Sequence, residues 1–154
     1  ERDFGVRFDK AKDLPLRSEH FLHLLVEQNL QPNSAIVSLL RLLKTKSFKI
    51  GVLSTQKRFI ITTLLQRWGL EEYIDHVFTT NDSVSSKEEA FARSEELLGF
   101  RPSEILLIED SPQVIKLAQS YGMRTIAVVH SLTKMDAVRA DAVIRIDTKA
   151  MAHH

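Results

Sequence analysis

Two adjacent carboxylates, Glu109 and Asp110, directly follow a run of four large apolar residues at positions 105–108. Such a run is typical of a strand buried on both faces in a parallel sheet. In open α/β sheets, ligands bind beyond the carboxyl ends of the strands, and two carboxylates placed there repel each other unless they share a cation. Their hard oxygens suit Mg²⁺, so Glu109 and Asp110 are candidate metal ligands. A solvated turn at the end of a strand is the alternative interpretation.

A pair of hydroxyl side chains follows another apolar stretch. Ser54 and Thr55 come directly after the strand expected over residues 48–53. A hydroxyl at the mouth of a parallel sheet, next to the start of a helix, can donate a hydrogen bond to a phosphate oxygen. It can equally serve only as the N-cap of the following helix, and the two roles are compatible.

Lys87 has an unusual position for a cation. Ser86 and Glu89 have the spacing of a capping box, which places Lys87 in the first turn of a helix. A positive charge there opposes the helix dipole. We therefore expect an anion close to Lys87, either one of the carboxylates at 109 and 110 or a bound phosphate. A lysine that points into water, where its charge is screened, is the alternative.

These residues must be positioned by alternating strands and helices. From residue 48 onward the pattern predicts a parallel sheet with helices on its faces and right-handed crossovers between neighbouring strands. The N-terminal third is more helical, with a helix expected over residues 18–29. The other expected helices cover 34–46, 59–68, 88–98 and 113–121, and the strands cover 48–53, 76–79, 105–108, 125–129 and 142–146.

Composition narrows the class of function. The chain has 154 residues and a net charge of +1, without a basic stripe, so we expect one domain and no nucleic-acid partner. It contains no cysteine, which excludes disulfides, thiolate zinc sites and a cysteine nucleophile and is compatible with the cytoplasmic location that we expect. No apolar run approaches about 18 residues, so no membrane span is predicted. The sequence leaves the oligomeric state open.

The order Ser54, Lys87 and Glu109-Asp110 resembles the second, third and fourth motifs of the haloacid dehalogenase superfamily of hydrolases. Residues 109–123 resemble the acidic motif and its following helix, except that Val114 stands where a glycine is usual and Leu117 where an alanine is usual. The resemblance covers residues 32–147. It implies a Rossmann-like parallel sheet with flanking helices in residues 32–150, and a helical remnant of a cap in residues 1–31.

Family chemistry is Mg²⁺-dependent phosphoryl transfer through an aspartyl-phosphate, so the resemblance implies a phosphatase of small phosphate monoesters. Carried over to this chain, Ser54 and Thr55 would bind the substrate phosphate, and Lys87 would neutralise the phosphate and the nucleophile. Glu109 and Asp110 would hold the metal, with Asp110 among the catalytic residues. Asp82, in the loop before Lys87, can help to orient the lysine or the metal in this family.

The nucleophile motif is where this chain departs from the family pattern. Family members carry it as the first Asp of an Asp-x-Asp motif, and no such motif followed by Gly-Thr is present here. Asp9, after the alternating patch at 4–8, is a candidate, but Ala11 occupies the position of the general acid. The nucleophile could instead lie upstream of Glu1 or have been lost. A chain that has lost it would be a catalytically inactive binding or interaction domain of the same fold.

Overall fold

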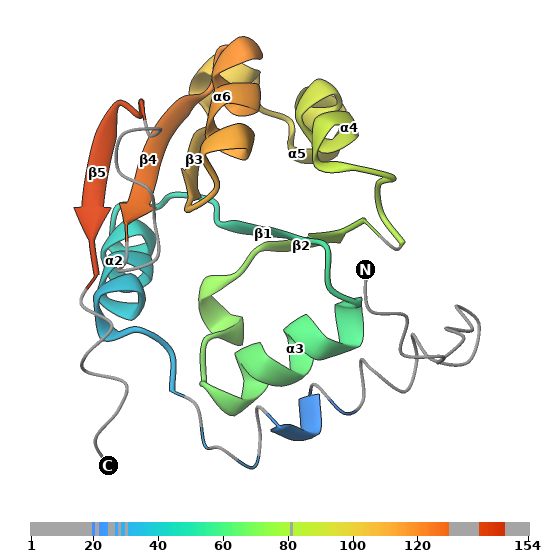
Figure 1. Cartoon of the computed structure of the whole chain (residues 1–154), viewed down its shortest axis with the longest axis vertical. Coiled ribbons are helices and arrows are strands. Elements are labelled where there is room, and N and C mark those ends of the chain that lie inside the picture. Colours follow the sequence, from blue (N-terminus) through green and yellow to red (C-terminus); the bar gives the residue numbers. More distant parts are fainter. Residues whose placement is uncertain are drawn as a thin grey trace, which may run out of the picture.

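The computed structural model describes residues 20, 22–24, 27, 29, 31–80, 82–129 and 139–146. Strands and helices alternate along the chain, as the sequence predicts (Figure 1). Their order is α2 (Ser34–Thr45), β1 (Gly51–Ser54), α3 (Arg58–Arg67), η1 (Glu71–Tyr73), β2 (His76–Thr79), α4 (Lys87–Ala92), α5 (Ser94–Leu98), η2 (Pro102–Glu104), β3 (Leu106–Glu109), α6 (Pro112–Ser120), β4 (Arg124–Val129) and β5 (Ala142–Arg145).

All strand pairs are parallel, which confirms the α/β fold class with flanking helices. Among the described residues the strands form two sheets, β1–β2 and β3–β4–β5, where the pattern alone suggested one. In Figure 1 the β1–β2 pair runs across the view, whereas β3, β4 and β5 run along it. In two of the pairs the strands begin side by side, with Gly51 opposite His76 and Leu106 opposite Arg124, whereas β5 begins opposite Ile126 of β4.

The best-packed part of the molecule surrounds β4. Thr125, Ala127 and Val129 alternate along β4 as buried residues, and α6 covers them with Ile115, which is 1% exposed. By contrast, every residue of β1 and β3 is half-buried or exposed, although the buried Ile50 comes directly before β1. A second buried cluster, formed by Phe91, Ala118 and Met123, packs against Leu53 of β1 and Leu107 of β3.

Two elements differ clearly from the sequence expectation. The strand expected over 48–53 begins only at Gly51, where pairing with β2 starts. The single helix expected over 88–98 is two helices, because the backbone bends at Arg93 (φ −101°, ψ 14°), whose side chain binds Glu89 on one side and Glu96 on the other. Helix α2 is capped by Asn33, whose side chain accepts hydrogen bonds from two backbone amides of the first turn.

The N-terminal region is described only in part. Residues 20, 22–24 and 27 are helical, within the helix expected over 18–29. The patch at 4–8, Asp9 and Ala11 lie outside the described residues. The division into a cap remnant at 1–31 and a core at 32–150 stays a prediction. Within the described part of the chain, no helix has the length and apolar character needed to cross a bilayer.

Candidate active site

Ser54 is the last residue of β1, and its side chain stabilises the turn that follows the strand. Its Oγ accepts a hydrogen bond from the backbone N–H of Gln56 at 3.1 Å. Lys57, and not Ser54, is the N-cap of α3, so the interpretation of Ser54 as a helix cap is wrong. Because Oγ acts as an acceptor in this turn, its own proton remains available for donation to a ligand. Thr55, next to it, is exposed.

Lys87 is the first residue of α4 and carries an ion pair. Its Nζ lies 2.6 Å from Oε2 of Glu109, the last residue of β3. The anion expected near Lys87 is therefore Glu109. The two side chains are only 23% and 14% exposed, so the pair is largely shielded from water and is screened less by salt than a surface pair.

The start of α4 is capped by two side chains, although not by the predicted box. Ser86 Oγ accepts from the N–H of Glu89 at 3.0 Å, as expected. The Glu89 carboxylate reaches back one residue further than predicted, to the backbone N–H and the hydroxyl of Ser85. These bonds, with Arg93, lower the pKa of Glu89 to about 2. The result is a fixed helix start, which holds the backbone of Lys87 in place.

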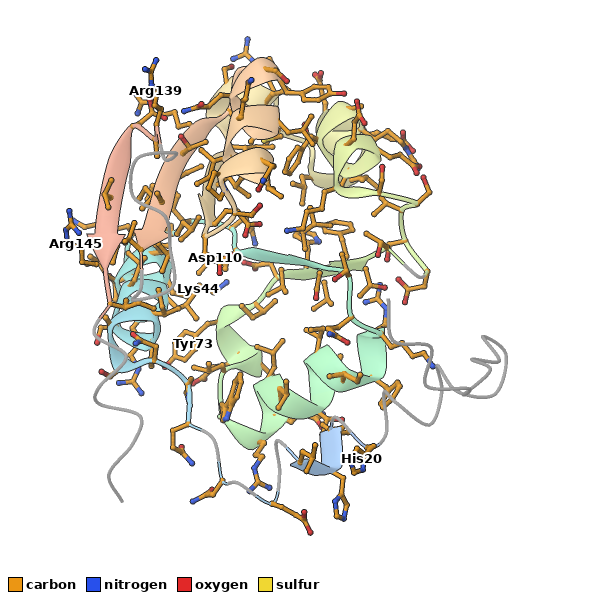
Figure 2. All side chains as sticks on the ribbon, viewed as in Figure 1. His20, Lys44, Tyr73, Asp110, Arg139 and Arg145 are labelled. Carbon is orange, nitrogen blue, oxygen red and sulfur yellow. The ribbon has the colours of Figure 1, made fainter. Side chains whose placement is uncertain are left out.

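Both oxygens of the Glu109 carboxylate are engaged. Oε2 receives the Lys87 ammonium, and Oε1 accepts from the backbone N–H groups of Asp110 at 3.0 Å and Ser111 at 3.2 Å. Glu109 therefore joins the start of α4 to the turn between β3 and α6. Asp110 follows at an exposed position, near the centre of the view beside the end of β3 (Figure 2).

The carboxylates of Glu109 and Asp110 are the candidate ligands for a divalent cation in this site. Glu109 and Asp110 supply two carboxylates at one strand end, but among the described residues no group of three or more His, Cys, Asp or Glu side chains could hold a metal. Mg²⁺ is commonly bound by one or two carboxylates, with waters and substrate phosphates completing an octahedron. The residues present fit that kind of site, with Asp110 the more accessible ligand because Glu109 is bound to Lys87.

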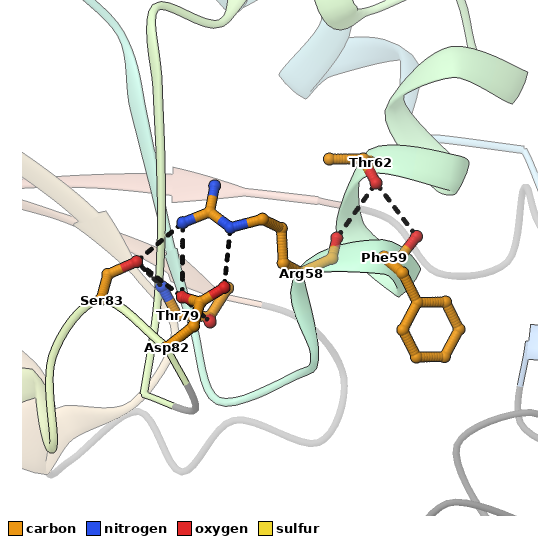
Figure 3. Close-up of polar contacts among 6 residues, drawn as sticks. All are labelled: Arg58, Phe59, Thr62, Thr79, Asp82 and Ser83. Atoms are coloured by element: carbon orange, nitrogen blue, oxygen red, sulfur yellow. Dashed lines mark hydrogen bonds and ion pairs between the residues drawn. The ribbon is translucent and has the colours of Figure 1, made fainter.

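Asp82 is hydrogen-bonded to Arg58, Thr79 and Ser83, and the role suggested for it in orienting the lysine or the metal stays a prediction. It accepts from Arg58 at 2.7 Å and from the Thr79 and Ser83 hydroxyls, each at 2.6 Å (Figure 3). The Arg58 guanidinium, followed by the Ser83 and Thr79 hydroxyls, holds the pKa of Asp82 well below its usual range. This cluster ties the first residue of α3 to the loop after β2.

Arg58 has a structural contact in the Asp82 cluster. Its Nη2 also donates to Ser83 Oγ at 2.7 Å. The spacing of 24 residues between Arg58 and Asp82 carries no local signal, so the sequence could not reveal the pair.

The structure thus brings together some of the predicted site residues. Lys87, Glu109 and Asp110 form one continuous set of contacts. Ser54 ends a strand of the other sheet, and no hydrogen bond among the described residues joins it to Lys87 or Glu109. The assignment of these residues to catalysis, substrate binding and metal binding stays a prediction.

Comparison with known proteins identifies the family. The sequence model of the haloacid dehalogenase-like hydrolase family matches residues 2–128. This match covers most of the chain, which belongs to that family. The resemblance seen in the motifs is confirmed at this level.

Individual relatives are more distant. Pyrophosphatase PpaX of Bacillus cereus (strain B4264) is 27% identical over 126 residues, covering 80% of this chain and 58% of the relative. The chain thus spans less than two thirds of the length of that protein. Among solved structures, a putative beta-phosphoglucomutase from Thermotoga maritima superimposes with a TM-score of 0.69 at 22% identity, covering 90% of this chain and 67% of that one.

A second similar structure is that of a protein named for a different reaction. L-2-haloacid dehalogenase from Xanthobacter autotrophicus gives a TM-score of 0.64 at 17% identity, covering 91% of this chain and 64% of that one. At these identities the two structures establish the fold alone. The fold is shared by proteins whose names denote different reactions, so the reaction of this chain must be argued from its own residues.

Proposed function

We propose that this chain forms the phosphate- and Mg²⁺-binding part of a phosphatase that hydrolyses a small phosphate monoester through an aspartyl-phosphate. The observation that carries the proposal is the shielded Lys87–Glu109 pair beside Asp110, at the start of α4 and the end of β3. Membership of the haloacid dehalogenase-like family and similarity to a protein named pyrophosphatase support a phosphate ester or anhydride as substrate.

Three side chains of this site would act on the phosphate and the metal. The Ser54 hydroxyl would donate a hydrogen bond to a phosphate oxygen, because its Oγ already accepts from Gln56. The Lys87 ammonium would stabilise the negative charge of the transferring group, held in position by Glu109. Asp110, with Glu109, would hold Mg²⁺, which when bound supplies positive charge next to the phosphate oxygens.

The attacking carboxylate would be that of Asp9 or of a residue upstream of Glu1. Both lie outside the described residues. Asp9 would form the bond to phosphorus, and the alcohol of the monoester would leave with the bonding electron pair. Water would then hydrolyse the acyl phosphate and restore the carboxylate. Ala11 cannot protonate the leaving group, so on this route phenols and other stabilised leaving groups should be turned over best.

Hydrolysis of p-nitrophenyl phosphate by the 154-residue chain, with and without Mg²⁺, tests the proposal, with pyrophosphate as a second substrate. Metal-dependent turnover that is lost in both Asp9→Asn and Asp110→Asn would show that the chain supplies its own nucleophile. Lys116→Met, which removes an exposed lysine of α6, is the control for Lys87→Met. Turnover that survives Asp110→Asn and Lys87→Met would contradict the roles assigned to them.

An inactive binding domain is the second candidate, and the closed Lys87–Glu109 pair favours it, because the ammonium is already neutralised without a ligand. A folded chain without turnover, titrated with orthophosphate and Mg²⁺ and followed by NMR, separates the two. Shifts at the amides of Ser54, Lys87 and Asp110 that disappear in Lys87→Met would support a phosphate site whose nucleophile lies elsewhere. Shifts absent from all three would overturn the proposal.

A further inference from the structure

The turn that follows Ser54 is held by polar contacts more than by packing. Ile50 before β1 and Ile60 in the first turn of α3 are buried, but every residue from 51 to 59 is half-buried or exposed. Within the turn, the Ser54 hydroxyl accepts from the N–H of Gln56, which fixes the internal shape of the turn and not its place in the molecule. The place of the turn must therefore be set by contacts at its two ends.

The first end of the turn is fixed by the backbone. Ser54 lies opposite Thr79 in the β1–β2 ladder, and its carbonyl accepts from the N–H of Thr80 at 3.0 Å. This bond continues the parallel ladder one step past the last pair of strand residues. The backbone of Ser54 thus has a defined position against the loop that follows β2.

The second end of the turn is fixed by Arg58, the first residue of α3. Its Nε and Nη2 donate to the two carboxylate oxygens of Asp82 at 2.7 and 3.3 Å, and Nη2 also donates to the Ser83 hydroxyl at 2.7 Å (Figure 3). A guanidinium that meets a carboxylate through two bonds fixes direction as well as distance. Both ends of the turn are therefore attached to the same loop after β2.

That loop provides a firm base for the contact. Thr79 is fully buried, and its hydroxyl donates to Asp82 at 2.6 Å. The Thr79 carbonyl accepts from the N–H groups of Asp82, Ser83 and Val84, and Val84 is itself buried. Asp82 is thus held in place by its own loop, and Arg58 brings the start of α3 to it.

The Arg58–Asp82 pair contributes to geometry more than to stability. The two side chains are 45% and 39% exposed, and solvent screens ion pairs that are this accessible. The loop that carries Asp82 continues directly to Lys87 at the start of α4. Since no hydrogen bond among the described residues joins Ser54 to Lys87, this contact is a route through which the spacing of the two can be set.

We propose that Arg58 and Asp82 are positioning residues for the phosphate-binding turn: their two-bond contact sets where the Ser54 hydroxyl lies relative to Lys87, and neither residue touches the phosphate. This inference rests on the proposed function, which assigns Ser54 and Lys87 to the phosphate. Displacement of a binding group by about 1 Å has large effects on a site, so loosening the turn should weaken phosphate binding about tenfold.

The sign of one effect tests the proposal. Orthophosphate is titrated into the whole chain with Mg²⁺ present and followed by NMR at the amides of Ser54 and Thr55. Asp82→Ala removes a negative charge, so charge alone would tighten the binding of an anion, whereas loss of the contact with Arg58 should weaken it about tenfold. Arg58→Gln should weaken binding similarly. Arg101→Gln, which breaks an exposed pair with Glu104, is the matched control and should leave binding unchanged.

A double-mutant cycle separates positioning from general destabilisation. Because Arg58 acts through Ser54, the combined Ser54→Ala and Arg58→Gln variant should bind orthophosphate no more weakly than Ser54→Ala alone, whereas independent effects would multiply. In the chain without ligand, Arg58→Gln should speed hydrogen exchange at the Gln56 amide by about tenfold, since the turn is less ordered. Exchange at Val52, inside β1, should be unchanged.

The outcomes distinguish this inference from the proposed function. Tighter or unchanged orthophosphate binding in Asp82→Ala, multiplied effects in the double variant, or unchanged exchange at Gln56 in Arg58→Gln would each overturn the positioning role alone. Absence of orthophosphate binding from the unsubstituted chain would overturn the proposed function, and with it the assignment of this pair to a phosphate site.

Discussion

Strands β4 and β3 have similar apolar sequences but very different environments. In β4, Thr125, Ala127 and Val129 are buried beneath α6, and a parallel strand pairs with each edge. In β3 every residue is half-buried or exposed, and among the described residues only one edge is paired. Strand β1 resembles β3 in both respects. Burial of a parallel strand thus depends on the strands beside it as much as on its own side chains.

This difference also locates the candidate site. Ser54 ends β1 and Glu109 ends β3, so the predicted phosphate and metal residues belong to the two strands that, among the described residues, are paired along one edge, and not to the packed strand β4. A region of low packing density has low local stability, which suits a segment that must rearrange to bind a ligand. The comparison predicts that mutations in the two regions lower the free energy of unfolding by different amounts.

The largest effect is expected in the packed region. Ile115→Ala deletes a side chain that contacts Ala127 and Val129, and it should lower the free energy of unfolding by about 2–5 kcal/mol, because the tight site cannot collapse around the cavity. Leu53→Ala, in half-buried β1, should cost only about 1 kcal/mol. Urea unfolding of both variants measures the difference, and equal costs would contradict the distinction between the regions.

Breaking the Lys87–Glu109 ion pair should have an intermediate effect on the free energy of unfolding. Lys87→Met leaves the shielded Glu109 carboxylate without its cation and should cost about 1–3 kcal/mol. Adding Glu109→Gln removes the uncompensated charge and should recover part of that loss. A double-mutant cycle measured by urea unfolding gives the coupling. Strict additivity of the two changes would show that the pair does not stabilise this region.

A backbone effect should be the same in both regions. Gly69, between α3 and η1, and Gly122, between α6 and β4, have φ values of 61° and 82°, and space is open around both. Replacement by alanine should cost about 1 kcal/mol at each position, because a side chain disfavours left-handed backbone. Thermal or urea unfolding checks both variants. A much larger cost at Gly122 alone would mean that packing, and not backbone conformation, sets the penalty there.

The smallest effect concerns acid sensitivity, which the two regions share. Asp75 accepts from Lys44 and from the N–H of Ile50, and Asp141 accepts from the N–H and hydroxyl of Thr125; these bonds hold both pKa values below the usual range. A depressed pKa stabilises the fold above the unfolded value of about 4, and the contribution is lost as the pH falls below it. Stability measured from pH 7 to pH 3 should therefore decline less steeply in Asp75→Asn and Asp141→Asn.

The two aspartates also serve as controls for each other. Asp75 directly precedes β2 and accepts from the N–H of Ile50, just before β1, while Asp141 directly precedes β5 and accepts from the N–H of Thr125, the second residue of β4. Because the two positions are alike, their substitutions should flatten the pH dependence to a similar degree. A pH profile unchanged in both variants would show that these carboxylates do not control acid stability.

The sequence predicted most strands and helices because apolar periodicity and capping residues act locally. It also predicted an anion near Lys87, since an uncompensated cation at a helix start is unfavourable. It could not predict the split of the sheet, because the apolar run at 105–108 indicates burial without specifying the neighbour that provides it. The Arg58–Asp82 contact could not be predicted either, because it joins segments far apart in the chain.

Residue-resolved hydrogen exchange of the chain tests most directly the claim that, as among the described residues, β1 and β3 are each paired along one edge only. Val52 and Leu107, whose N–H groups point toward β2 and β4, should exchange slowly. Their neighbours Leu53 and Ile108 should exchange fast, although they belong to the same strands. Equal protection of all four amides would show that both edges are already paired and would contradict the account.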